Sequence, residues 1–97
     1  MNVTLDEESA KTMKEIPPRV THINADCFNY RHEINKIIMP DRVTSIGNDC
    51  FNYLTSLTKI VLSTNLKRIG NGCLNNLQSL QEIIIPDSVI RIDGELC

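Results

Sequence analysis

Residues 40–62 read PDRVTSIGNDCFNYLTSLTKIVL, and most of the chain repeats this stretch with variations. Residues 17–39 read PPRVTHINADCFNYRHEINKIIM, and residues 63–85 read STNLKRIGNGCLNNLQSLQEIII. A fourth copy, PDSVIRIDGELC, begins at residue 86 and reaches residue 97 about halfway through the repeat. The starts at 17, 40 and 63 are 23 residues apart. A fixed period of this length is typical of a solenoid, in which each repeat forms one coil.

Each repeat begins with a short extended segment that ends at a turn. Two apolar positions enclose two polar ones, as Val43 and Ile46 do in the second copy. The next position holds residue types that tolerate a left-handed backbone, so we expect a sharp turn there in every coil. These residues are Asn24, Gly47, Gly70 and Asp93.

A short helix and a closing strand are predicted for the rest of the repeat. Asp26, Asp49 and Gly72 lie in or beside the helix cap position. The apolar residues that follow in the second copy have helical spacing: Cys50, Phe51, Leu54 and Leu57. The repeats close on KIIM, KIVL and EIII, which are rich in β-branched residues. Stacking the coils would pair these closing strands in a parallel sheet.

The first copy departs from the helical pattern at one position. Arg31 stands where the later copies have Leu54 and Leu77. An end coil with one exposed face would tolerate this change.

We divide the chain into an N-terminal segment, residues 1–16, and a repeat domain, residues 17–97. The repeats span 17–39, 40–62 and 63–85, followed by a truncated repeat at 86–97. In the N-terminal segment, Thr4 and Glu7 could form a capping box that opens a short helix. A frayed tail is the alternative. Residues 13–16 resemble a closing strand, which would make this segment an imperfect first coil.

Composition and charge exclude several classes of protein. The net charge of −2 argues against nucleic acid as the default partner. No stretch approaches the roughly 20 apolar residues of a membrane span, so we expect no membrane insertion. The N-terminus is acidic and polar, unlike a signal peptide. We therefore expect a cytoplasmic protein, with the cell surface as the alternative if a signal has been removed.

Cys27, Cys50 and Cys73 occupy the same position in three successive repeats. A small thiol is a good core filler. On the helical side of the coils, equivalent positions would lie roughly 10 Å apart, which is too far for a disulfide. A zinc site needs paired ligands such as C-x-x-C, and the chain has none. We therefore expect reduced core thiols, no metal and no other cofactor, and reduced thiols favour a reducing compartment.

No catalytic constellation is visible in the sequence. The chain lacks a P-loop, a nucleophile elbow, an H-E-x-x-H motif and a dinucleotide-binding glycine pattern. Neither histidine is placed to activate a thiol. We therefore expect no enzymatic activity.

The pattern L-x-x-I-x-L-P followed by V-x-x-I-G-x-x-(A/C)-F resembles the BspA-like, or Treponema pallidum-type, class of leucine-rich repeats. The residues that carry it recur 23 positions before and after the middle copy, where they are Val43, Ile46, Gly47, Phe51, Leu57, Ile60 and Leu62. The resemblance covers residues 17–97. It implies an α/β leucine-rich-repeat solenoid, with a parallel sheet on the concave face and short helices on the convex face. It also implies protein binding without catalysis. Members occur in anaerobic bacteria and protozoan parasites, often as surface adhesins and also inside cells.

The closing strands offer a candidate binding surface on the concave face. The first and third apolar residues of each strand should point inward, so the middle ones form an exposed ladder of Ile38, Val61 and Ile84. Polar residues border this ladder: Lys36, Lys59 and Glu82, then Asn35, Thr58 and Gln81. An apolar ridge with a charged border has the make-up of an interaction patch. Alternatively, β-branched residues simply favour strands, whichever face they occupy.

Two other rows of residues stand out. The basic one is more simply explained as solvated surface, whereas for the asparagines an exposed polar row and a hydrogen-bonded ladder explain the sequence equally well. A basic row could meet an acidic partner or a phosphate. It comprises Arg19, Arg42, Lys67, Arg68 and Arg91. On the helical side, asparagines in every coil could form a hydrogen-bonded ladder beside Tyr30 and Tyr53.

The fourth copy suggests self-association, because a terminal coil without a polar cap exposes its stacking face. The contact would involve Val89, Ile92, Leu96 and Cys97. A fragment of a longer array would explain the same feature. The sequence thus predicts a protein–protein interaction module that binds through the concave sheet, forms a homo-oligomer through its last coil, or does both. The alternative is a surface adhesin or antigen of a microbe or protozoan parasite.

Overall fold

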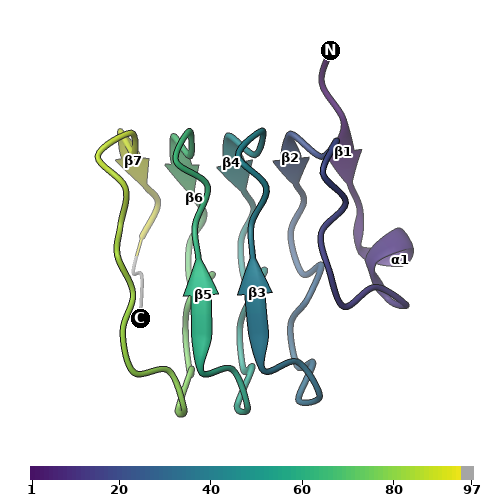
Figure 1. The fold of residues 1–97 in the computed structure, drawn as a ribbon, viewed down its shortest axis with the longest axis vertical. Coiled ribbons are helices and arrows are strands. Elements are labelled where there is room, and N and C mark those ends of the chain that lie inside the picture. Colours follow the sequence, from purple (N-terminus) through teal and green to yellow (C-terminus); the bar gives the residue numbers. More distant parts are fainter. Residues whose placement is uncertain (95–97) are drawn as a thin grey trace.

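The computed structural model describes residues 1–94. Within them, the elements follow in the order β1 (Thr4–Leu5), α1 (Glu7–Ala10), β2 (His22–Ile23), β3 (Lys36–Ile38), β4 (Ser45–Ile46), β5 (Lys59–Val61), β6 (Arg68–Ile69) and β7 (Arg91–Ile92). Five strands form one sheet in the order β1-β2-β4-β6-β7, and β3 pairs with β5 in a second sheet. The coils stand side by side (Figure 1).

The strand register confirms that each 23-residue repeat is one coil. Ile23 pairs with Ile46, Ile46 with Ile69, and Ile69 with Ile92, each step being 23 residues. All pairs are parallel, as predicted. However, the larger sheet is built from the segments that open each coil, whereas only two of the closing strands pair with each other.

The inward-facing positions of successive coils form one continuous core. Phe28 and Phe51 stack with ring centroids 5.7 Å apart. Val43, Leu54 and Leu57 are fully buried in the same core. Because equivalent residues lie one above another, each apolar position of the repeat becomes a row of contacts.

The helices predicted on the convex side are wrong, since residues 24–35 and 47–58 contain turns without α-helix. Positive φ values recur four residues apart, at Asp26 and Tyr30 and again at Asp49 and Tyr53, and such residues interrupt a helix. The backbone bonds instead to the next coil. Phe28 N–H donates to the carbonyl of Cys50, and Phe51 N–H to that of Cys73, both at 2.9 Å. Turns and helices share the same apolar spacing here, so periodicity alone did not separate them.

The expected left-handed turn position is also displaced. Positive φ falls on Asp26, Asp49 and Gly72, two residues after the position that the sequence indicated. Glycine is needed at positions 47 and 70 for a different reason, which is close backbone approach. A Cβ on Gly47 would lie 2.5 Å from the nitrogen of Ala25, and one on Gly70 would lie 2.5 Å from the carbonyl carbon of Gly47.

The three repeated cysteines are reduced and buried in the core, as predicted. The argument from a helix diameter was wrong, because neighbouring coils are joined by direct hydrogen bonds on this side. Cys50 donates from Sγ to the carbonyl of Asn24 at 2.8 Å. Burial raises the pKa of the Cys73 thiol to about 12. The Cys73 thiol is therefore protonated at neutral pH.

The N-terminal segment forms a shortened coil. Leu5 pairs with Ile23, an offset of 18 rather than 23 residues. The cap of α1 is Asp6, whose carboxylate accepts from the N–H of Ser9 at 2.8 Å, so Thr4 does not form the expected capping box.

Arg31 attaches this shortened coil to the repeats. Its guanidinium donates to the carbonyls of Ala10 at 3.0 Å and Met13 at 2.8 Å. It also pairs with Glu33 at 2.6 Å. The side chain is only 17% exposed. Arg31 is therefore a contact residue of the first repeat, and the exposed face that we expected to tolerate it is covered.

Candidate interaction surface

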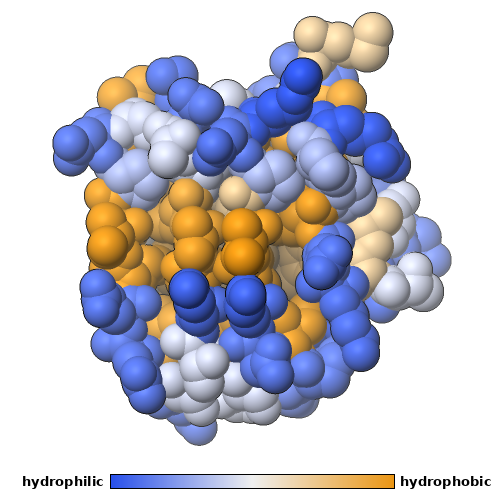
Figure 2. All heavy atoms as spheres, in the orientation of Figure 1, coloured by the Kyte–Doolittle hydropathy of each residue, from blue (hydrophilic) through white to orange (hydrophobic). Residues whose placement is uncertain are grey.

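One face of the molecule carries the exposed ladder that the sequence predicted. The middle residues of the closing segments are exposed: Ile38 by 56%, Val61 by 41% and Ile84 by 73%. Their neighbours Ile37 and Ile60 are buried, because successive side chains of a strand point to opposite faces. Figure 2 shows the resulting apolar band, with hydrophilic residues on both sides. We call this surface the β3–β5 face.

Charged side chains border the ladder. Lys36 and Lys59 are in register on β3 and β5. Glu82 lies at the equivalent position of the third coil and is exposed. Within residues 1–94, none of the three takes part in a salt bridge. Their charges are therefore available to a partner.

The polar row beyond these charges, one position earlier in each coil, is held more firmly. Thr58 donates to the carbonyl of Asn35 from its N–H at 2.9 Å and from its hydroxyl at 3.1 Å. Gln81, the third member of this row, is exposed. The structure thus brings all nine predicted residues onto one face, and their role in binding stays a prediction.

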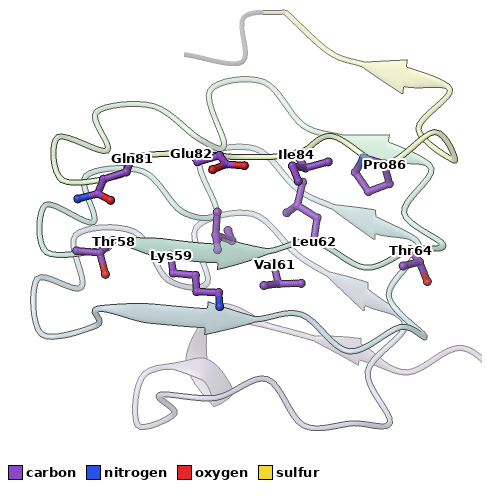
Figure 3. A pocket seen from close by; sticks show the side chains of 10 residues that line it. Thr58, Lys59, Val61, Leu62, Thr64, Gln81, Glu82, Ile84 and Pro86 are labelled. Carbon is purple, nitrogen blue, oxygen red and sulfur yellow. The ribbon is translucent and has the colours of Figure 1, made fainter.

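A groove of about 870 Å³ lies beside this ladder, between β5 and residues 81–86. We call residues 81–86 the third closing segment. Figure 3 shows Val61 and Leu62 on one wall, and Glu82, Ile84 and Pro86 on the other. Within the described residues, no backbone hydrogen bond joins the two walls.

The strand predicted for EIII is therefore wrong. Its inner residues Ile83 and Ile85 are only half-buried, whereas Ile37 and Met39 of the first repeat are buried. Strand propensity without the packing of a buried face does not fix a strand.

A second groove borders the other edge of the two-stranded sheet, beside β3. It has a volume of about 600 Å³ and lies between β3 and residues 14–16. Lys14, Glu15 and Ile16 line it together with Lys36 and Ile38. Sequence reasoning missed both grooves, because each depends on a pairing that does not form.

A family model described as the BspA type leucine-rich repeat region (six copies) matches residues 7–96. The chain belongs to this family. The comparisons with curated proteins and with solved structures gave no match. Membership of this family suggests a repeat protein that binds other proteins, and leucine-rich repeat proteins are typically non-catalytic.

The residues proposed for self-association in this BspA-type repeat protein are only partly described. Val89 is half-buried against the core, and Ile92 on β7 is 42% exposed. Leu96 and Cys97 lie outside the described residues. Beside Ile92, Ile90 is 80% exposed, which the sequence analysis had not noted.

The basic row is partly neutralised. Arg68 and Arg91 reach the carboxylate of Asp93 at 3.7 Å and 2.6 Å. This pairing weakens the positive potential that a phosphate or an acidic partner would need.

The turn side of the coils, where the sequence analysis expected helices, carries an aromatic pair. Tyr30 and Tyr53 stack with centroids 4.8 Å apart. Beside them, one side-chain bond joins asparagines of neighbouring coils, from Asn76 Nδ2 to Asn52 Oδ1 at 3.5 Å.

Two further properties bear on the class of protein. No three possible ligand residues among positions 1–94 cluster in a way that could hold a metal ion. In the same range, no helix has the length and apolar character needed to cross a bilayer.

Proposed function

We propose that this BspA-type repeat protein is a binding module that engages a partner protein through the β3–β5 face. The observation that carries this proposal is the row of Ile38, Val61 and Ile84, all exposed on one face and bordered by charges that form no salt bridge within residues 1–94. An interface of standard size covers about 800 Å² on each partner, so the ladder would be its apolar centre and the charged border its rim.

The test is the substitution Val61→Asp, which places a charge at the centre of the ladder. Immobilised wild-type protein should capture a partner from a lysate of the source cells, and Val61→Asp should lose at least nine-tenths of that capture. Tyr30→Asp is the control, because Tyr30 is an exposed aromatic residue that lies outside the face and outside the β7 coil. Circular dichroism should be the same for all three proteins. Undiminished capture by Val61→Asp would refute the proposal.

A second candidate function is self-association, which the exposed Ile90 and Ile92 favour. Both residues belong to the coil of β7, at one side of the five-stranded sheet. Light scattering on a size-exclusion column, at several concentrations and with reductant, should then give a defined oligomer. Ile92→Asp should return it to a monomer, and a wild-type mass of 11.0 kDa at high concentration would exclude this candidate.

The proposed location is the cytoplasm. Three buried thiols, none in a disulfide, suit a reducing compartment. The alternative is a surface adhesin, which the resemblance to this repeat class implies. Antibody labelling of intact and permeabilised cells separates the two, since a cytoplasmic protein is labelled only after permeabilisation.

A further inference from the structure

We propose that the groove between β5 and the third closing segment binds an extended peptide of a partner protein, which adds to the open edge of β5 as a strand. This inference rests on the proposed function and names its binding mode. Unpaired strand edges are templates for such addition, in which main-chain hydrogen bonds supply affinity and alternate side chains supply specificity.

The backbone of β5 is satisfied on one edge only. Met39 N–H donates to the carbonyl of Val61 at 2.9 Å, so this carbonyl faces β3. In a parallel ladder, the residue next in sequence turns its N–H and C=O to the opposite edge. The N–H and C=O of Ile60 therefore face the groove, and Ile60 is one of the residues that line it. Within the described residues, no backbone group of the third closing segment bonds to β5.

The volume of the groove is comparable to that of a short strand. A strand rises about 3.3 Å per residue, lies about 4.8 Å from its neighbour and belongs to a sheet about 10 Å thick. The product of these dimensions for five residues is a volume of roughly 800 Å³. The groove measures about 870 Å³. Among residues 1–94, no backbone–backbone hydrogen bond involves residues 81–85, so no such bond fixes their separation from β5.

The walls specify the chemistry of the peptide. Side chains that point inward would lie beside Ile60 and Leu62, which are buried, and the outward one would lie between Val61 and Ile84. These three consecutive positions therefore call for apolar, β-branched or leucine side chains.

The preceding outward position lies between opposite charges. Lys59 and Glu82 stand on the two walls and form no ion pair with each other. A lysine or glutamate of the peptide would meet one like charge there, whereas a neutral glutamine can hydrogen-bond to both side chains. The structure thus favours a segment that reads polar and neutral, then three apolar residues.

The experiment measures the fluorescence anisotropy of a labelled peptide with the core Thr-Gln-Ile-Val-Leu, flanked by glycine and serine, against the full chain. We expect saturable binding that weakens at least tenfold when the valine nitrogen of the peptide is methylated. That N–H would donate to the carbonyl of Ile60. Replacing the peptide's glutamine by lysine or by glutamate should also weaken binding to the wild-type protein.

A charge exchange tests the register. In Lys59→Glu both walls are acidic, so the lysine peptide should bind this variant several-fold more tightly than the glutamine peptide does. Tyr30→Asp, which changes an exposed residue outside the groove and outside the β7 coil, should bind all peptides as the wild type does. Lack of peptide binding, or equal affinity of the methylated peptide, would overturn strand addition.

These results are separable from those on the proposed function. If Val61→Asp abolishes partner capture while methylation of the peptide has no effect, the face binds through side chains and strand addition is wrong. A concentration-dependent dimer that the peptide does not dissociate would also overturn it, since a second copy would then occupy the groove.

Discussion

Replacing Arg31 by leucine restores the residue found at this position in the later repeats, yet the structure predicts that it destabilises the protein. The guanidinium donates to the carbonyls of Ala10 and Met13. A hydrogen bond to a charged group contributes about 1.5–3 kcal/mol, and the lower value suits a side chain that remains partly exposed. Loss of both bonds therefore costs roughly 3 kcal/mol.

Burial of the new leucine offsets part of this loss. A leucine that packed as fully as Leu54 would gain at most about 2 kcal/mol, but the two carbonyls make this site polar. We expect a net loss of roughly 2 kcal/mol, which for a domain of this size lowers Tm by about 10 °C.

Urea and thermal unfolding followed by circular dichroism measure this loss. Amide hydrogen exchange locates it, since the N–H of Thr21 donates to the carbonyl of Val3 and should exchange faster in Arg31→Leu. Glu33→Gln is the control, because it removes the exposed ion pair and keeps both backbone contacts of Arg31. Its effect should be much smaller. If Arg31→Leu is as stable as the wild type or more stable, the hydrogen bonds of Arg31 do not determine the stability contributed by this position, and the leucine of the repeat pattern suits it at least as well.

Three further predictions concern other parts of the molecule. Gly70→Ala should lower the free energy of unfolding by about 1–3 kcal/mol in urea titrations, because its Cβ would lie 2.5 Å from the backbone of Gly47; an unchanged midpoint would contradict the close approach. Burial raises the pKa of Cys73 to about 12, so this thiol should resist alkylation at pH 8 in the folded protein and react in urea; labelling of the native protein, read by mass spectrometry, would contradict this. The hydrogen bond from Arg31 lowers the pKa of Glu33, so the ionised carboxylate stabilises the fold above its ordinary pKa of 4.5, and this contribution is lost as the pH falls through the lowered folded-state pKa. In acid unfolding experiments, the free energy of unfolding should fall less over that pH range for Glu33→Gln than for the wild type. Identical curves would show that the Arg31–Glu33 ion pair does not contribute to stability.

The repeat period determined the parts of the fold that depend on stacking. Once residues 23 apart are placed side by side, the parallel register and the rows of Val43 and Ile46 follow from the sequence. The exposed ladder followed as well, because alternation in a strand leaves Ile38 and Val61 outside whenever their neighbours are buried.

The convex side was not predictable by the same reasoning. The spacing of Cys50, Phe51 and Leu54 suits a helix and also suits a chain of turns whose N–H groups bond to the next coil. The turns differ from a helix in the left-handed backbone at Asp49 and Tyr53. Unlike glycine, these residue types do not indicate a left-handed backbone in the sequence.

Two features that the repeat period did not predict depend on irregularities of the repeat. The 18-residue offset between β1 and β2 gives Arg31 its carbonyl partners, and a comparison at 23-residue spacing cannot detect it. The groove exists because the third closing segment does not pair, although its sequence, EIII, favours a strand.

The most direct test of the central proposal is photo-crosslinking from single positions. The photoreactive residue p-benzoylphenylalanine would replace Val61 on the β3–β5 face in one protein and Tyr53, an exposed aromatic residue of the opposite side, in another. Irradiation in the source cells should give a discrete adduct, heavier than the chain, from position 61 and none from position 53. An adduct from position 53 without one from position 61 would show that the partner binds elsewhere and would contradict the assignment of the β3–β5 face.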